Sequence, residues 1–150
     1  MSEGFRAVLV LALGAAAVLA RLAWQAARTP ASDGTRLVAE FRVIRLGAIL
    51  LAATAASYIG FAVARAETTG AALEIALAAG FITVAAIAMT RDPRQALAML
   101  ALGFVAHALL DIAHRPGFLS PEFAPRWYLI GCAVYDSAVA AICYWPALRR

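Results

Sequence analysis

Long apolar segments fill most of this chain and leave little else from which a fold can be built. Five of them hold about 18 or more residues each. They lie at roughly residues 5–24, 44–64, 70–90, 95–114 and 126–148. A helix of that length crosses the hydrocarbon of a bilayer and satisfies its own backbone hydrogen bonds there. The sequence therefore predicts an all-α fold, a polytopic integral membrane bundle of five transmembrane helices in a single domain over residues 1–150.

Composition agrees with a membrane protein and excludes several kinds of chemistry. Apolar residues make up 64% of the chain and the mean hydropathy is +0.81, which leaves too little polar surface to cover a soluble domain. All 13 basic residues are arginine. Because lysine is absent, a retinal or pyridoxal Schiff base, a P-loop and a lysine general base are excluded. The arginines flank the apolar segments, so membrane lipids are the expected partners of this basic chain, and nucleic acid is not.

The connections between the apolar segments differ in character. Residues 25–40 contain turn-forming and polar residues and are predicted to form the longest connection. Residues 90–94 contain Asp-Pro and predict a tight hairpin, so the third and fourth helices should be antiparallel neighbours. Residues 115–125 hold prolines that prevent a helix, beside Phe118 and Phe123, which are too apolar for free solution. This connection should lie in the membrane interface or fold over a site.

Successive connections between spanning helices lie on alternate sides of the membrane. The arginines are distributed unevenly between these two sides. One side holds four of them: Arg6, Arg65, Arg115 and Arg126. The other side holds nine: Arg21, Arg28, Arg36, Arg42, Arg45, Arg91, Arg94, Arg149 and Arg150. The positive-inside rule places the nine in the cytoplasm. We therefore expect a bacterial inner-membrane protein with its N-terminus outside and its C-terminus in the cytoplasm.

A stripe of titratable residues interrupts the fourth apolar segment. His107, Asp111 and His114 stand at i, i+4 and i+7, so they share one face of a helix. Ionisable groups are costly in hydrocarbon, and those found there usually serve a function. Asp136, about 15 Å along the last segment from its start at a rise of roughly 1.5 Å per residue, reaches the depth of His107.

In the predicted orientation, the stripe and Asp136 lie in the outer half of the bundle. Two further polar residues lie in the same half. Glu74 stands one turn inside the third segment, and Tyr58 lies near the outer end of the second. With the stripe and Asp136, four helices thus contribute six polar groups at similar depth. The sequence predicts that these groups meet where the helices meet.

A metal centre is the first interpretation of this group. His107 and His114 would supply imidazole ligands, and Asp111 or Asp136, together with Glu74, would supply carboxylates, with Cys132 as a soft alternative ligand. Mixed nitrogen and oxygen ligands suit Zn or non-haem Fe with an open position for water or oxygen. A haem is disfavoured, because two histidines of one helix cannot ligate both faces of one ring unless a dimer pairs one from each subunit.

Two other interpretations need no metal. Asp111 and Asp136 could share a proton, with His107 as the relay, in an isomerase, a cyclase or a proton-transfer protein. Tyr58 and Tyr135 are then further candidate catalytic residues. Alternatively, the polar groups only hydrogen-bond between helices, at about 1 kcal/mol per pair, in a structural or accessory subunit.

The function favoured by the sequence is a metal-dependent membrane enzyme that acts on a lipid-like, lipid-soluble small molecule. The substrate would enter the polar site laterally from the outer leaflet. Small residues along the helices favour close helix packing, and in a chain of 150 residues a homo-oligomer would help to bury the remaining polar faces.

Overall fold

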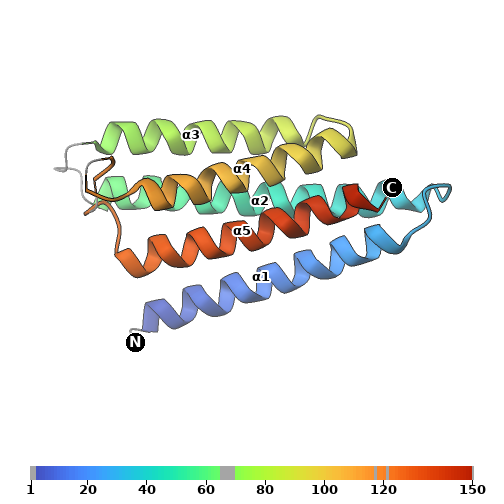
Figure 1. The fold of residues 1–150 in the computed structure, drawn as a ribbon, viewed down its shortest axis with the longest axis horizontal. Helices are drawn as coiled ribbons and strands as arrows, with labels where there is room; N and C mark the ends of the chain where they lie inside the picture. The colour runs from blue at the N-terminus through green and yellow to red at the C-terminus, as the bar shows by residue number, and fades with distance from the viewer. Residues whose placement is uncertain (1–2, 65–69, 117, 121, 150) are drawn as a thin grey trace.

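The described part of the protein, seen in a computed structural model, is a bundle of five α-helices, as the apolar segments predict (Figure 1). The structure describes residues 3–64, 70–116, 118–120 and 122–149. The helices are α1 (Glu3–Arg28), α2 (Thr35–Ala64), α3 (Ala71–Ala88), α4 (Pro93–Ala113) and α5 (Arg126–Leu148). All five are long and apolar enough to cross a membrane, which is consistent with an integral membrane protein.

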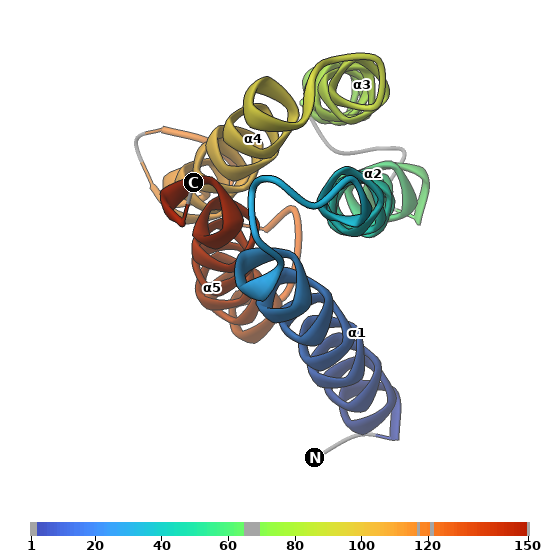
Figure 2. The same cartoon turned by 90° about the vertical axis from the view of Figure 1, so that its right-hand side faces the viewer.

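The helices run along the long axis of the molecule, and the two ends of the chain lie at opposite ends of the bundle (Figure 1). The most extensive packing is between α4 and α5 and between α2 and α3. Helix α1 lies at one edge, where it contacts only α2 and α5 among the described helices (Figure 2). The inner helices α2 and α4 are therefore the ones around which a buried site can form.

The first two helices are longer than the apolar pattern predicts. Helix α1 continues to Arg28 and α2 already begins at Thr35, so the prediction that residues 25–40 form the longest connection is wrong. The turn-forming residues 29–34 do form the connection, whereas the polar residues on either side of them occupy helix ends. Arg36 and Glu40 form an i, i+4 pair within the first turns of α2, with 3.0 Å between Nε and Oε1. The apolar pattern begins this helix at residue 44, whereas the structure includes the Arg36–Glu40 pair in its first turns.

The hairpin between α3 and α4 is confirmed. Asp92 caps α4, and its side chain accepts hydrogen bonds from the backbone N–H groups of Arg94 at 3.1 Å and Gln95 at 3.2 Å. Pro93 follows in the first turn, where its missing N–H costs nothing. The two helices therefore run antiparallel and in contact, as expected.

The connection between α4 and α5 buries some of its apolar side chains and exposes others. Phe123 and Ala124 are buried, whereas Phe118 is 71% exposed. Of the other residues used in the predictions, Arg65, Gly117, Pro121 and Arg150 lie outside the described residues. The inward turn at Phe123 closes the end of the bundle at which α4 ends.

Gly103 of α4 brings two helices close together just before His107 in the chain. A methyl group at Gly103 would lie 2.8 Å from Cδ2 of Leu51 on α2. The space beside this glycine is therefore filled by a neighbouring helix.

Candidate functional site

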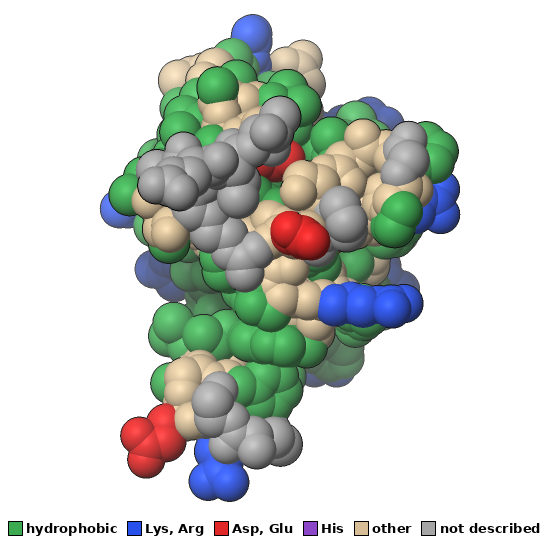
Figure 3. All heavy atoms as spheres, turned by 90° about the vertical axis from the view of Figure 1, so that its left-hand side faces the viewer, with side chains coloured by type: hydrophobic (Ala, Val, Ile, Leu, Met, Phe, Trp, Pro, Cys, Tyr) green, Lys and Arg blue, Asp and Glu red, His purple; other side chains and the backbone are tan. Residues whose placement is uncertain are grey.

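Six polar side chains from four helices are buried together in the half of the bundle where α4 ends and α5 begins. All are at most 7% exposed. They are Tyr58 of α2, Glu74 of α3, His107 and Asp111 of α4, His114 directly after the last residue of α4, and Asp136 of α5. We call this group the His107 centre. Figure 3 looks on to this end of the molecule, and neither histidine side chain is visible on that face.

His107, Asp111 and Asp136 form the core of the His107 centre. The Nδ1 atom of His107 lies 2.7 Å from Oδ2 of Asp136 and 3.5 Å from Oδ2 of Asp111. One ligand atom of each residue lies within 4.8 Å of the other two. The i, i+4 spacing on α4 places His107 beside Asp111, and the close packing of α5 against α4 adds Asp136.

Aromatic rings hold this triad in place. The imidazole of His107 meets the rings of Phe81 and Tyr58 edge to face, at centroid distances of 4.9 and 5.0 Å. The hydroxyl of Tyr58 donates a hydrogen bond of 2.5 Å to Oδ1 of Asp111. The imidazole and one carboxylate of the triad are therefore oriented by residues outside it.

His114 and Glu74 form a second pair in the same centre. Nε2 of His114 lies 3.1 Å from Oε1 of Glu74, and its Nδ1 donates to the carbonyl of Leu110 at 2.9 Å. Since a carbonyl only accepts, the second proton of the pair lies on either Nε2 or the carboxyl group, and the pair is neutral in both cases. Phe123 stacks on His114 at 5.2 Å between ring centroids and covers the pair.

Tyr58 connects the pair to the triad. Its ring also contacts His114, at 5.4 Å between centroids. The histidine and carboxylate residues expected to provide ligands thus lie in one connected cluster. Among the described residues, only His107, Asp111 and Asp136 form a group of three ligand atoms within 4.8 Å of one another. His114 and Glu74 contact each other and lie beside that group.

Four buried polar atoms of the His107 centre have no hydrogen-bond partner among the described residues. They are Oε2 of Glu74, Nε2 of His107, Oδ2 of Asp111 and Oδ1 of Asp136. Oδ2 of Asp111 lies 3.5 Å from Nδ1 of His107, close enough for an ion pair, but this contact does not have the geometry of a hydrogen bond. Buried polar atoms in a purely structural network are almost always paired, and each exception calls for an explanation.

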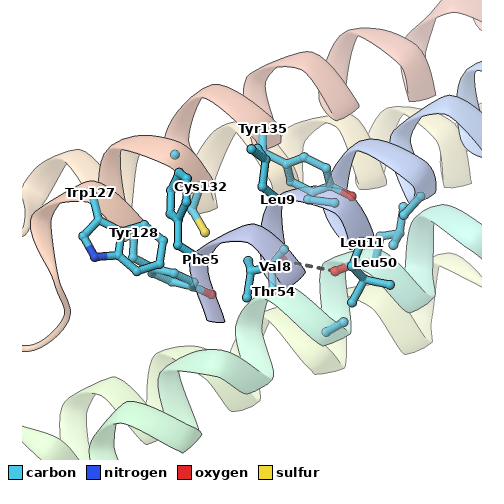
Figure 4. A pocket seen from close by; sticks show the side chains of 14 residues that line it. Phe5, Val8, Leu9, Leu11, Leu50, Thr54, Trp127, Tyr128, Cys132 and Tyr135 are labelled. Carbon is cyan, nitrogen blue, oxygen red and sulfur yellow. Dashed lines mark hydrogen bonds between the residues drawn. The ribbon is translucent and has the colours of Figure 1, made fainter. Parts of the chain in front are cut away.

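Tyr135 and Cys132 lie apart from the convergent triad. Successive residues of an α-helix are rotated by about 100° about its axis, so Tyr135 and Asp136 face different sides of α5. Both side chains line an apolar groove between α1, α2 and α5, with a volume of about 240 Å³ (Figure 4). Tyr135 points into this groove, and neither residue belongs to the group of converging ligand atoms among the described residues.

A second buried polar site, at the opposite end of the bundle, was missed by the sequence analysis. Arg36 is 6% exposed and Glu40 is 1% exposed, and we call this pair the Arg36 centre. The guanidinium donates to Glu40 and to the carbonyls of Thr29, Pro146 and Arg149, with five hydrogen bonds between 3.0 and 3.5 Å. The i, i+4 spacing of Arg36 and Glu40 was the sequence feature from which this pair could have been predicted.

Comparisons of the chain with protein-family models, curated proteins and solved structures found no match. The class of the protein therefore follows from its own fold and site. It is an all-α bundle of five helices that can span a membrane, with a buried group of histidine and carboxylate side chains in one half.

Proposed function

We propose that this protein is a small membrane enzyme with a divalent metal centre, Zn or non-haem Fe, that acts on a lipid-soluble substrate. The observation that carries the proposal is the convergence of one imidazole and two carboxylates. His107, Asp111 and Asp136 offer ligand atoms within 4.8 Å of one another in an otherwise apolar bundle. One nitrogen and two oxygen ligands are a donor set that Zn and non-haem Fe both accept, with a position left for water or substrate.

Charge balance supports the metal. Two carboxylates and a neutral imidazole carry a charge of −2, which a divalent cation neutralises, and unpaired charge is costly in a buried site. Without metal, the triad is neutral only if it binds two protons in addition to the one on the neutral imidazole. Metal binding must then displace these protons, so the apparent affinity for metal rises with pH.

The residues around the triad suit supporting roles. Tyr58 would hold the Asp111 carboxylate through its 2.5 Å hydrogen bond, as outer partners of metal ligands do. His114 and Glu74, next to the triad, provide a proton donor and acceptor pair for groups bound there.

The apolar groove of Figure 4 supports a lipid-soluble substrate. Leu11 on its rim is 75% exposed, so the groove opens to the side of the bundle, toward lipid. Its wall contains Cys132 and Tyr135, which belong to the same helix as Asp136. A substrate in this groove would therefore lie against the helix that carries one ligand of the proposed metal centre.

The proposed setting is the bacterial inner membrane. The excess of nine arginines over four favours an orientation with the N-terminus outside, so the His107 centre would lie in the outer leaflet. A homo-oligomer in that membrane would cover apolar faces that are exposed in the single chain.

Metal analysis of the purified protein tests the proposal. We expect about one Zn or Fe per chain and its loss in His107→Ala, because a site with two remaining ligands binds metal far more weakly. Glu74→Gln is the matched control, since it alters the neighbouring pair and should retain the metal. Absence of a transition metal from wild-type protein after growth and purification without chelators would refute the metal centre.

A metal-free acid–base site is the second candidate, and the position of His107 favours it. Its Nδ1 atom lies between two carboxylates, at 2.7 and 3.5 Å, where it can relay a proton between them. Such a site would serve an isomerase, a cyclase or proton transfer. It predicts an infrared band of a protonated carboxyl group that persists in a chelator and disappears in Asp111→Asn. A purely structural role predicts instead that His107→Ala lowers thermal stability alone.

A further inference from the structure

The ends of α1 and α5 carry a matched pair of tryptophans and arginines. Arg28 stacks on Trp24 with its Cζ atom 4.1 Å from the ring centroid, and Arg149 stacks on Trp145 at 5.4 Å. Stacking on an aromatic ring limits the freedom of the guanidinium and leaves its N–H groups available for an anion. The four side chains, with Ala27, line a cavity of about 220 Å³.

An apolar groove continues from the same two tryptophans toward the middle of the bundle. Its volume is about 240 Å³. It lies between α1 and α5 and is lined by Ala20, Ala23, Trp24, Ala141, Ile142 and Trp145. Because the alanines are small, the two helices leave room between the rings for a hydrocarbon chain. The paired cavities thus combine a cationic end with an apolar channel.

The Arg36 centre fixes the spacing of the two arginines. The guanidinium of Arg36 donates to the carbonyl of Thr29, next to Arg28, and to the carbonyl of Arg149 itself. Figure 2 looks on to this end of the bundle, where the last turns of α1 and α5 lie close together. A buried side chain therefore holds the backbone beside both cationic groups, which pre-organises them.

We propose that this site binds one anionic phospholipid of the membrane. The phosphate would lie between Arg28 and Arg149, and an acyl chain would occupy the groove between Trp24 and Trp145. The charge complementarity, the continuity of the two cavities and their place at the end of spanning helices all select a lipid over a soluble anion. The site is at the opposite end of the bundle from the His107 centre and does not depend on the function proposed for it.

Native mass spectrometry in detergent, with phosphatidylglycerol or phosphatidylcholine added, tests the site. We expect wild-type protein to bind one phosphatidylglycerol at least roughly tenfold more tightly than phosphatidylcholine, since each arginine near a lipid phosphate adds a favourable interaction. The double variant Arg28→Gln/Arg149→Gln should lose this preference. Ala20→Phe/Ala141→Phe should weaken binding of both lipids, because the rings fill the groove while the charges remain.

The matched control is Arg91→Gln/Arg94→Gln, which removes two exposed arginines from the same end of the bundle, away from the groove. It should bind phosphatidylglycerol within about twofold of wild type, as expected where screened surface charge contributes little. An equal loss in this control would show diffuse surface charge and overturn the site. So would equal binding of soluble glycerol phosphate, or wild-type protein without preference for the anionic lipid.

Discussion

The two buried polar centres of this bundle are opposites in how their hydrogen bonds are satisfied. In the Arg36 centre, five hydrogen bonds match the five N–H donors of the guanidinium. In the His107 centre, four buried polar atoms have no partner among the described residues. Both centres are almost fully buried, so solvent does not explain the difference.

The contrast agrees with a structural role for the Arg36 centre and with the binding role proposed for the His107 centre. Arg36 binds carbonyls at the C-terminal ends of α1 and α5, where a cation also complements the helix dipoles. It joins three helix ends and leaves no donor for a ligand. The His107 centre keeps acceptor atoms in an apolar environment at an energetic cost, as sites that bind something commonly do.

The largest effect on stability is expected at the Arg36 centre. Arg36→Ala leaves the Glu40 carboxylate buried without its cation and removes the donors from two helix ends. We expect the free energy of unfolding in mixed micelles to fall by about 3–5 kcal/mol. Arg42→Ala, at an exposed position six residues further along the same helix, is the control and should change it little. A loss below about 1 kcal/mol for Arg36→Ala would contradict the structural role.

Tyr58→Phe should have an intermediate effect on the His107 centre. The variant keeps the ring contacts but removes the hydrogen bond to Asp111, so we expect a loss of about 1–3 kcal/mol in unfolding free energy. Under the metal proposal, affinity for the metal should also fall by about 10–100-fold, measured by competition with a chelator. Tyr144→Phe, on an exposed face, should change neither quantity.

The sequence predicted the five helices because each has to be apolar over its full membrane-spanning length. It also predicted that polar groups gather at one end, because titratable residues occur at similar depth in four apolar segments. The structure brings Tyr58 and Glu74 together with Asp111 and His114, as that argument requires. Depth along a helix follows from counting residues, so the gathering of these polar groups at one end could be predicted from the sequence alone.

Rotation about a helix axis and pairing between helices could not be predicted in the same way. Asp136 faces the triad while its neighbour Tyr135 faces a groove, and this depends on how α5 packs against α1 and α4. For the same reason, the separation of His114 and Glu74 from the triad of His107, Asp111 and Asp136 did not follow from spacing. Arg36 was overlooked because its partners Pro146 and Arg149 lie more than a hundred residues away and contribute only carbonyls.

Exchanging a carboxylate for an amide at each centre sharpens the comparison. In Asp136→Asn the amide oxygen can still accept from Nδ1 of His107 while a buried charge disappears, so metal-free stability should change by less than about 1 kcal/mol. Under the metal proposal, the variant should lose its metal. Glu40→Gln makes the same exchange at the Arg36 centre and should cost clearly more, because it leaves Arg36 a buried cation without its anion. Equal losses of stability would remove the distinction between the centres.

The smallest effect is expected from Asp33, an exposed acid close in the chain to Arg36. Hydrogen bonds from the backbone N–H and side chain of Thr35 hold the pKa of Asp33 below its ordinary value of 3.8. A lowered pKa stabilises the folded protein above the ordinary value, and this contribution is lost as the pH falls through the folded pKa. Asp33→Asn should therefore lower the thermal midpoint slightly at neutral pH.

Thermal unfolding of both proteins from neutral pH to below pH 3.8 checks this expectation. The two curves should converge at the acidic end, where Asp33 is protonated and its charge no longer counts. A difference that persists there would assign the effect to hydrogen bonding alone. A loss at neutral pH as large as that of Arg36→Ala would mean that charge in the α1–α2 connection, rather than burial of one guanidinium among carbonyls, holds this end of the bundle together.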